Sequence, residues 1–168
     1  MRTIAMTAAA LAALALLAAG GGSSNASTLP GGPLGTAAAA RFSACLVTNT
    51  AGIDKGLNKV SWQGMKAAVA AEPNKILVKY LVSQAAPDYA TNITVFILEK
   101  CGLIITVGST MASVTENAAN ANPKVKFAIV ACTYQSGCLT GKKLRNITSV
   151  KGTATAVKTV VLATANGT

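Results

Sequence analysis

The clearest chemical signal in this sequence of 168 residues is a set of four cysteines, Cys45, Cys101, Cys132 and Cys138. A structural zinc site is disfavoured, because the chain has no histidine and no C-x-x-C pair. An even number of cysteines is typical of exported, disulfide-bonded proteins. Three pairings are possible. The short spacing favours a small closed loop between Cys132 and Cys138, which leaves Cys45 to pair with Cys101.

Other groups that could do chemistry are sparse. Without histidine, Ser-His-Asp and Cys-His catalysis are excluded. The acidic residues are few and none are closely paired, which speaks against a two-carboxylate hydrolase. The segment Gly137–Lys143 looks like a phosphate loop, but its glycines are too close together and Lys143 stands where Ser or Thr must hold magnesium. We therefore expect a chain that is not an enzyme and uses no cofactor and no metal.

The formal net charge of the chain is +10, from 15 basic and 5 acidic side chains. From Gly141 onward the chain has five basic residues and no acid. Such a tail can bind nucleic acid or anionic lipid. No aromatic residue follows Tyr134 to stack on bases, so a solvated basic face is favoured and no nucleic-acid partner is expected.

Residues 1–19 are typical of an export signal, with Arg2 before the apolar stretch Ile4–Ala19. An uncleaved membrane anchor is the alternative. Leu17-Ala18-Ala19 has the shape of a lipoprotein cleavage site, but Gly20 replaces the lipid-carrying cysteine. Residues 20–40 are rich in Gly, Ser, Pro and Ala, which indicates a flexible linker. We expect an extracytoplasmic protein that is membrane-associated or secreted.

Strand and helix patterns alternate from Ala44 onward. Apolar runs predict four strands, and segments of helical periodicity between them predict three helices, with Asp88 as a capping residue. The predicted strands are 44–48, 75–83, 103–107 and 125–130, and the predicted helices are 57–71, one that begins at Asp88, and 111–121. This order predicts an α/β fold, a parallel sheet with helices on both faces.

Ligands of such sheets bind beyond the carboxyl ends of the strands. In this sequence those ends are the loops 49–57, 108–111 and 131–134. We expect a binding site there.

Several segments taken in order resemble a known family. They are Cys45–Asp54, Asn58–Met65, Asp88–Ile93, Cys101–Gly108, Ala121–Val130 and Cys132–Leu144. Together they resemble the basic membrane protein family of solute-binding lipoproteins, the purine-nucleoside-receptor type, from about Ala44 to Ile147.

The resemblance implies a periplasmic-binding-protein-like type I fold, here the first lobe only. It also implies a receptor subunit of an ABC importer, in which two α/β lobes close on a nucleoside-like solute and then dock on a membrane permease. Small-molecule sites between domains fit that role.

The family pattern also implies ligand-binding positions, several of which carry other side chains here. Asn49 and Asp54 stand where the family has acids, Leu57 where it has an aromatic that stacks on a base, and Ala131 where it has an Asp suited to ribose hydroxyls. Asn58 opens the first helix, and Ser109 replaces a bulky apolar residue after Gly108. The expected site residues are Asn49, Asp54, Leu57, Asn58, Gly108, Ser109 and Ala131.

Residues 41–147 are thus expected to form an amino-terminal lobe, followed by an atypical basic tail, 148–168. No second lobe follows, and an altered reading frame is one hypothesis for the tail, although Val157–Ala163 has a strand-like composition. The expected function is therefore an apparently truncated solute-binding protein. The alternative is a non-transport envelope module that serves as a scaffold.

Overall fold

The computed structural model describes residues 40–167. The expected signal peptide and nearly all of the expected linker, Gly20 included, lie outside the described residues. None of the helices between residues 40 and 167 has both the length and the hydrophobicity that crossing a bilayer requires.

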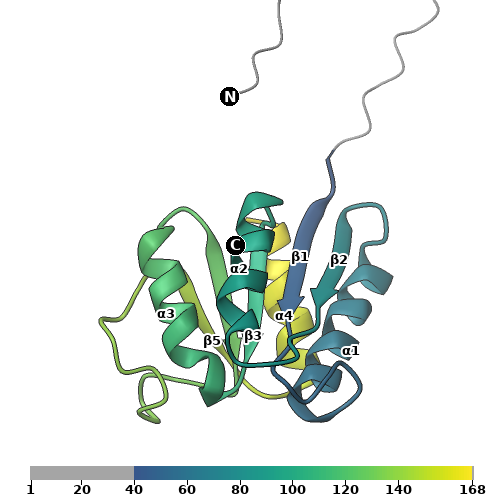
Figure 1. Ribbon diagram of the computed structural model, residues 1–168. Helices are drawn as coiled ribbons and strands as arrows, with labels where there is room; N and C mark the ends of the chain where they lie inside the picture. Colours follow the sequence, from purple (N-terminus) through teal and green to yellow (C-terminus); the bar gives the residue numbers. More distant parts are fainter. Residues whose placement is uncertain (1–39, 168) are drawn as a thin grey trace, which may run out of the picture. The chain divides into compact units, whose positions relative to one another are not determined.

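The described residues form five strands and four α-helices, with one 3₁₀ turn (Ser109–Met111) before α3 (Figure 1). Strands and helices alternate up to β4, which is followed by β5 with no helix between them. In chain order they are β1 Phe42–Val47, α1 Gly56–Ala71, β2 Ile76–Leu81, α2 Asp88–Leu98, β3 Leu103–Val107, α3 Ala112–Ala121, β4 Lys126–Val130, β5 Ile147–Val150 and α4 Ala154–Ala165.

All the strand pairs are parallel, and the strand order is β2-β1-β3-β4-β5. Helices α2 and α3 pack side by side on one face of the sheet, and α1 and α4 pack together on the other (Figure 1). This is the expected α/β fold. Each strand therefore ends at one edge of the sheet, which we call the carboxyl edge, and begins at the opposite amino edge.

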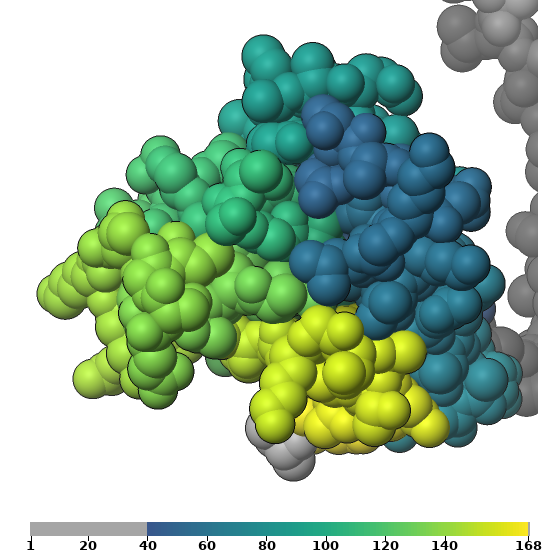
Figure 2. All heavy atoms as spheres, turned by 90° about the horizontal axis from the view of Figure 1, so that it is seen from below, coloured from purple at the N-terminus to yellow at the C-terminus, as the bar shows by residue number. Residues whose placement is uncertain are grey.

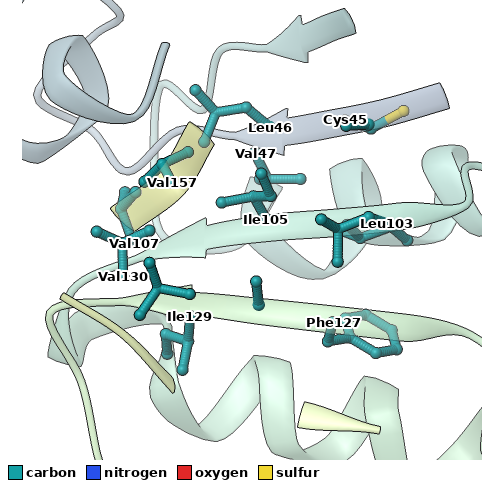
Figure 3. Close-up of a cluster of buried hydrophobic side chains, with 14 of the residues drawn as sticks. Cys45, Leu46, Val47, Leu103, Ile105, Val107, Phe127, Ile129, Val130 and Val157 are labelled. Atoms are coloured by element: carbon teal, nitrogen blue, oxygen red, sulfur yellow. The ribbon is translucent and has the colours of Figure 1, made fainter. Parts of the chain in front are cut away.

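The core is built from the central strands. Every residue of β3 is buried, as are the last four residues of β1 and of β4. Figure 3 shows Leu46, Ile105 and Ile129 among these side chains, together with Val157 of α4, which belongs to the same buried cluster. Near-continuous apolar runs are what a parallel strand covered on both faces requires, and this explains why the short central strands were identifiable from the sequence.

Three of the predicted boundaries and roles need correction. Strand β1 begins at Phe42, before the expected Ala44, because Phe42 N–H donates to Lys75 O and extends the pairing with β2. A 3₁₀ turn precedes α3 where an unbroken helix from Met111 was expected. Asp88 is the first residue of α2, and its Oδ2 accepts from Gln84 and Ala85 N–H (2.8 and 2.9 Å). It therefore ties down the preceding loop and does not cap the helix.

The strand-like interpretation of Val157–Ala163 is wrong, because this segment lies in α4. Val157 and Val161 are four residues apart and fully buried, which is the spacing of one helix face. The Thr153 side chain accepts from Ala156 N–H at 3.2 Å and caps the helix. A fifth strand, β5, precedes α4 and pairs with β4. The boundary expected at Ile147, between the lobe and the basic tail, thus falls on the first residue of β5.

The structure contains both expected disulfides. Cys45, in the middle of β1, pairs with Cys101 just before β3, with the Cα atoms 6.2 Å apart. Cys132 pairs with Cys138 in the loop that leaves β4. The first bond ties two neighbouring strands of the core, and the second closes a surface loop.

Candidate functional site at the carboxyl edge of the sheet

Loops from four strands meet at the carboxyl edge. Figure 2 looks onto the molecule from this side and shows the segment after β1 in blue beside the start of α4 in yellow, with the green segment after β4 next to them. The three loops expected to form a site, 49–57, 108–111 and 131–134, all follow strands that end here.

Asn49 and Asn58 form the most connected polar pair of this edge. Asn58 Nδ2 donates to Asn49 Oδ1 at 2.9 Å and to Gly52 O at 2.8 Å, and Asn49 N–H donates to Asn58 Oδ1 at 3.3 Å. Asn49 Oδ1 also accepts from Ala51 N–H at 3.0 Å. Asn58 is 1% exposed, so its amide is used within the loop. No hydrogen bond is found within residues 40–167 for Asn49 Nδ2, which leaves that group available to a ligand.

Leu57 links the segments that meet here. A Cβ atom built on Gly108 would lie 3.8 Å from Leu57 Cδ1 and 4.0 Å from Asn49 Nδ2. A Cβ atom built on Gly152 would lie 3.0 Å from Leu57 Cδ2 and 3.3 Å from Ala131 Cβ. Five of the seven expected site residues, Asn49, Leu57, Asn58, Gly108 and Ala131, therefore lie in one neighbourhood.

The backbone after β3 and β4 turns sharply at this edge. Gly108 has φ +75°, a conformation that glycine adopts without strain, and its N–H donates to Val130 O at 2.9 Å. Ala131 has φ +57°, which is uncommon for a residue with a side chain, and its N–H donates to Val150 O at 2.8 Å. These bonds continue the strand pairing and bring Ala131 to the exposed rim.

The other two expected residues make no contact that ties them to this neighbourhood. Asp54 is exposed and has no hydrogen bond or ion pair to any residue in the range 40–167. Ser109 is exposed at the start of the 3₁₀ turn, and its side chain has no hydrogen-bond partner in the same range.

Gly152 and Thr153 were missed by the sequence reasoning, because residues 148–168 were interpreted as a tail. Gly152 follows β5 and contributes the fourth loop of the edge, next to Leu57 and Ala131. The sequence did contain a signal for this loop. Gly152 and Thr153 stand directly before an apolar helical pattern, and small residues also follow two other strands, Gly108 after β3 and Ala131 after β4.

Replacing Asn58 with alanine is expected to lower the free energy of unfolding by about 2–3 kcal/mol, because it leaves the buried polar partners of its amide unsatisfied. Urea denaturation of the full chain measures this. The matched control is Asn120→Ala, at an exposed asparagine of α3 whose side chain has no hydrogen-bond partner among residues 40–167. It should change stability by less than about 0.5 kcal/mol. Equal effects of the two substitutions would mean that the Asn49–Asn58 pair does not hold the loop.

The chemistry of this edge suits binding. It offers the Asn49 amide N–H₂ group, the half-buried apolar side chain of Leu57 and the half-buried backbone of Gly108 and Gly152. Within the described residues no cluster of three or more His, Cys, Asp or Glu side chains could hold a metal ion. None of the cavities of 230–420 Å³ is lined by Asn49, Leu57, Gly108 or Ala131. Two cavities of 420 Å³ only border the edge, one at Val150 and Lys151 and the other at Tyr134. The carboxyl edge is thus an open surface, as one wall of a two-walled site would be.

The sequence matches one family over residues 43–157, described as ABC transporter substrate-binding protein PnrA-like (Bmp). The match continues ten residues beyond Ile147, where the resemblance was expected to end, and takes in β5 and the start of α4. The chain is 30% identical over 93 residues to the "CD4+ T-cell-stimulating antigen" of Listeria monocytogenes and to that of Listeria innocua. That similarity covers 53% of this chain but only 26% of each relative, so the chain spans about a quarter of their length.

Solved structures show a similar fold. A fragment of a presumed lipoprotein from Peptoclostridium difficile 630 has a TM-score of 0.63 and 22% identity, covering 76% of this chain and all of that fragment. An ABC transporter solute-binding protein from Aeropyrum pernix K1 has a TM-score of 0.51 and 17% identity, covering 64% of this chain and 28% of that protein.

Proposed function

Because the chain belongs to the PnrA-like family of ABC transporter substrate-binding proteins, we propose that the carboxyl edge of its sheet is one wall of a site for a nucleoside-like solute. Members of the family are binding proteins, and the chain is not an enzyme. The observation that carries the proposal is the convergence of Asn49, Leu57, Gly108 and Ala131, which come from three separate loops, around one open surface.

Each of these groups suits part of a nucleoside. The Leu57 side chain gives an apolar surface for a base, in place of the aromatic ring of the family pattern. Asn49 Nδ2 can donate to a base carbonyl or a ribose oxygen. Gly108 has no side chain of its own, so its half-buried backbone allows a ligand that contacts Asn49 and Leu57 to approach closely. Solute binding between two such walls, followed by docking on an ABC permease, is the proposed transport role.

Export to the extracytoplasmic side, through residues 1–19, belongs to the same proposal. Two disulfides among the described residues support it, because such bonds persist in oxidising compartments. Whether the chain is then tethered at the membrane or released depends on how residues 17–20 are processed, given Gly20 in place of cysteine.

The proposal predicts that nucleosides stabilise the full chain. At ten times the dissociation constant, a ligand that binds only the native state adds about 1.4 kcal/mol, which raises Tm by roughly 3–6 °C. Differential scanning fluorimetry with adenosine, guanosine, inosine and uridine at millimolar concentration measures the shift, and free ribose is the control. If no nucleoside shifts Tm, this chain alone is not a nucleoside receptor, and the scaffold alternative is favoured.

A single substitution tests whether position 131 contacts the ribose of the ligand. Ala131→Asp restores the carboxylate of the family pattern at an exposed position whose backbone conformation Asp tolerates better than Ala. Charge-assisted hydrogen bonds to ribose hydroxyls should then tighten nucleoside binding by roughly tenfold to a hundredfold. Ala131→Asn is the matched control, with the same shape but no charge, and equal affinities of the two variants would contradict ribose binding at this position.

A further inference from the structure

Basic residues precede every strand of the sheet. Arg41 lies one residue before β1 and Lys75 one residue before β2. Lys100 lies shortly before β3, and Arg145 shortly before β5. Lys124 precedes β4, and Lys126 is its first residue. All six are exposed.

Because all the strands are parallel, these residues lie at the same edge of the sheet, the amino edge. Following the strand order, they form a row of Lys75, Arg41, Lys100, the Lys124–Lys126 pair and Arg145. With neighbouring strands about 4.8 Å apart, five strands span roughly 20 Å. We call this row the basic edge.

Little acidic charge offsets the basic edge. Two of the five acidic residues of the chain lie near it, and both are already paired with a lysine. Glu72 Oε2 lies 3.7 Å from Lys75 Nζ, and Glu99 Oε2 lies 2.8 Å from Lys79 Nζ. Within residues 40–167, Lys75 is the one member of the basic edge that takes part in an ion pair.

An apolar side chain projects from the same edge. The helices run antiparallel to the strands, so α2 ends at the amino edge, at Leu98. Leu98 is 75% exposed, compared with 42% for Tyr80 and 38% for Val82, the other exposed large hydrophobic residues among those that the structure describes. Cationic side chains around an exposed leucine are typical of surfaces that bind at a membrane interface.

We propose that the basic edge lies against an anionic lipid surface. Strand β1 begins at this edge, one residue after Arg41, so a chain held at a membrane by its amino-terminal segment would be attached on the side of the basic edge. The candidate solute site lies at the opposite edge and would face away from the lipid. Flat, multivalent attraction fits a row of cations on separate loops. Two of the cations have an aromatic residue beside them in the sequence, but Phe42 is half-buried and Phe127 is buried, so neither ring is presented for stacking on bases.

A structural role for these cations is the competing explanation. The carboxyl ends of α1, α2 and α3 lie at this edge, and Lys75, Lys100 and Lys124 follow them, where positive charge offsets the helix dipole. That role predicts a change in stability on substitution and no dependence on lipid. A lipid-binding role predicts the reverse, and vesicle binding separates the two.

The experiment compares two triple variants of the full chain that have the same net charge. K100Q/K124Q/R145Q removes three cations of the basic edge, and K55Q/K59Q/K151Q removes three exposed lysines near the opposite edge. Both keep the amino-terminal segment. Co-sedimentation is measured with phosphatidylcholine vesicles, with and without about 30% phosphatidylglycerol, at about 0.1 M salt.

We expect the unmodified chain to bind the phosphatidylglycerol vesicles at least tenfold more strongly than phosphatidylcholine alone. The basic-edge variant should lose between tenfold and a hundredfold of the binding to phosphatidylglycerol vesicles, and the opposite-edge variant threefold or less. Equal losses would overturn the proposal, since net charge alone would then explain binding. Binding to soluble polyphosphate without binding to vesicles would overturn it too.

Leu98→Ser gives a second measurement that does not depend on how well the triple variants fold. Since Leu98 is 75% exposed, this substitution should leave Tm unchanged. It should weaken binding to phosphatidylglycerol vesicles by about threefold to tenfold, because a leucine in contact with lipid contributes hydrophobic free energy. Unchanged binding would show that Leu98 does not enter the lipid surface and would contradict the proposed orientation.

Discussion

Replacing Cys45 and Cys101 with alanine is expected to lower the free energy of unfolding by about 4 kcal/mol, the largest effect of any change considered for this chain. The bond joins residues 56 positions apart, so it removes much conformational freedom from the unfolded chain. Both sulfur-bearing side chains are also buried, at 0% and 6% exposure, between β1 and β3 in the core. Equilibrium denaturation with urea measures the difference.

The second disulfide is the natural control. Cys132 and Cys138 are only 6 positions apart, and the loop model predicts a loss of about 2 kcal/mol for C132A/C138A. The sharper prediction is that C45A/C101A destabilises the protein more than C132A/C138A does, because each variant removes one disulfide and replaces two cysteines with alanine. A larger loss for C132A/C138A would show that the loop after β4 contributes more to stability than the bond within the sheet.

The substitution Gly64→Val is expected to lower the free energy of unfolding by about 3 kcal/mol, because it forces α1 and α4 apart. A Cβ atom on Gly64 would overlap the backbone oxygen of Ala154 and lie 2.7 Å from Val157 Cβ. Gly64→Ala should also destabilise the protein, although alanine in an exposed helix interior is about 1 kcal/mol more favourable than glycine. The sign of the alanine effect therefore reports whether α4 packs on α1.

Gln63→Val controls for a β-branched residue in the same helix turn, since Gln63 is exposed, and it should change stability by no more than about 0.7 kcal/mol. A neutral or stabilising Gly64→Ala would show that α4 is not docked on α1. That result would favour the interpretation of residues 148–168 as a tail outside the fold. Destabilisation would mean that these residues belong to the fold.

Much of the fold was predictable because its signals are local. Leu103–Val107 was predicted with the observed bounds, since a short apolar run with a glycine at each end is typical of a buried strand. Helix α1 was predicted to within one residue, because its apolar positions recur with the helical period and Pro73 follows its end. The role of Asp88 was not predictable, because the same side chain can serve the helix or the preceding loop.

The candidate site was predictable in its place and less so in its detail. Parallel strands place the loops after β1, β3 and β4 at one edge whatever their side chains, so the neighbourhood of Asn49, Gly108 and Ala131 was expected. The pattern of residue types could not show that the Asn58 amide, at the start of α1, is bonded to the preceding loop, since that depends on where Gly52 O and Asn49 Oδ1 lie. Nor could it show that Gly152 joins the site.

Local periodicity and composition were enough to predict the alternation of strands and helices and to exclude histidine-based catalysis. The spacing of the four cysteines favoured one of three possible pairings, which is the one that the structure contains. Only the tertiary structure decided that Ile147–Val150 completes the sheet and that Val157 and Val161 face α1 from a helix. It also decided that six cations separated along the chain stand in one row, opposite the candidate site. The reason is physical: a helix or strand depends on neighbours a few residues away, whereas strand order, helix docking and the sharing of an edge depend on contacts between residues far apart in sequence.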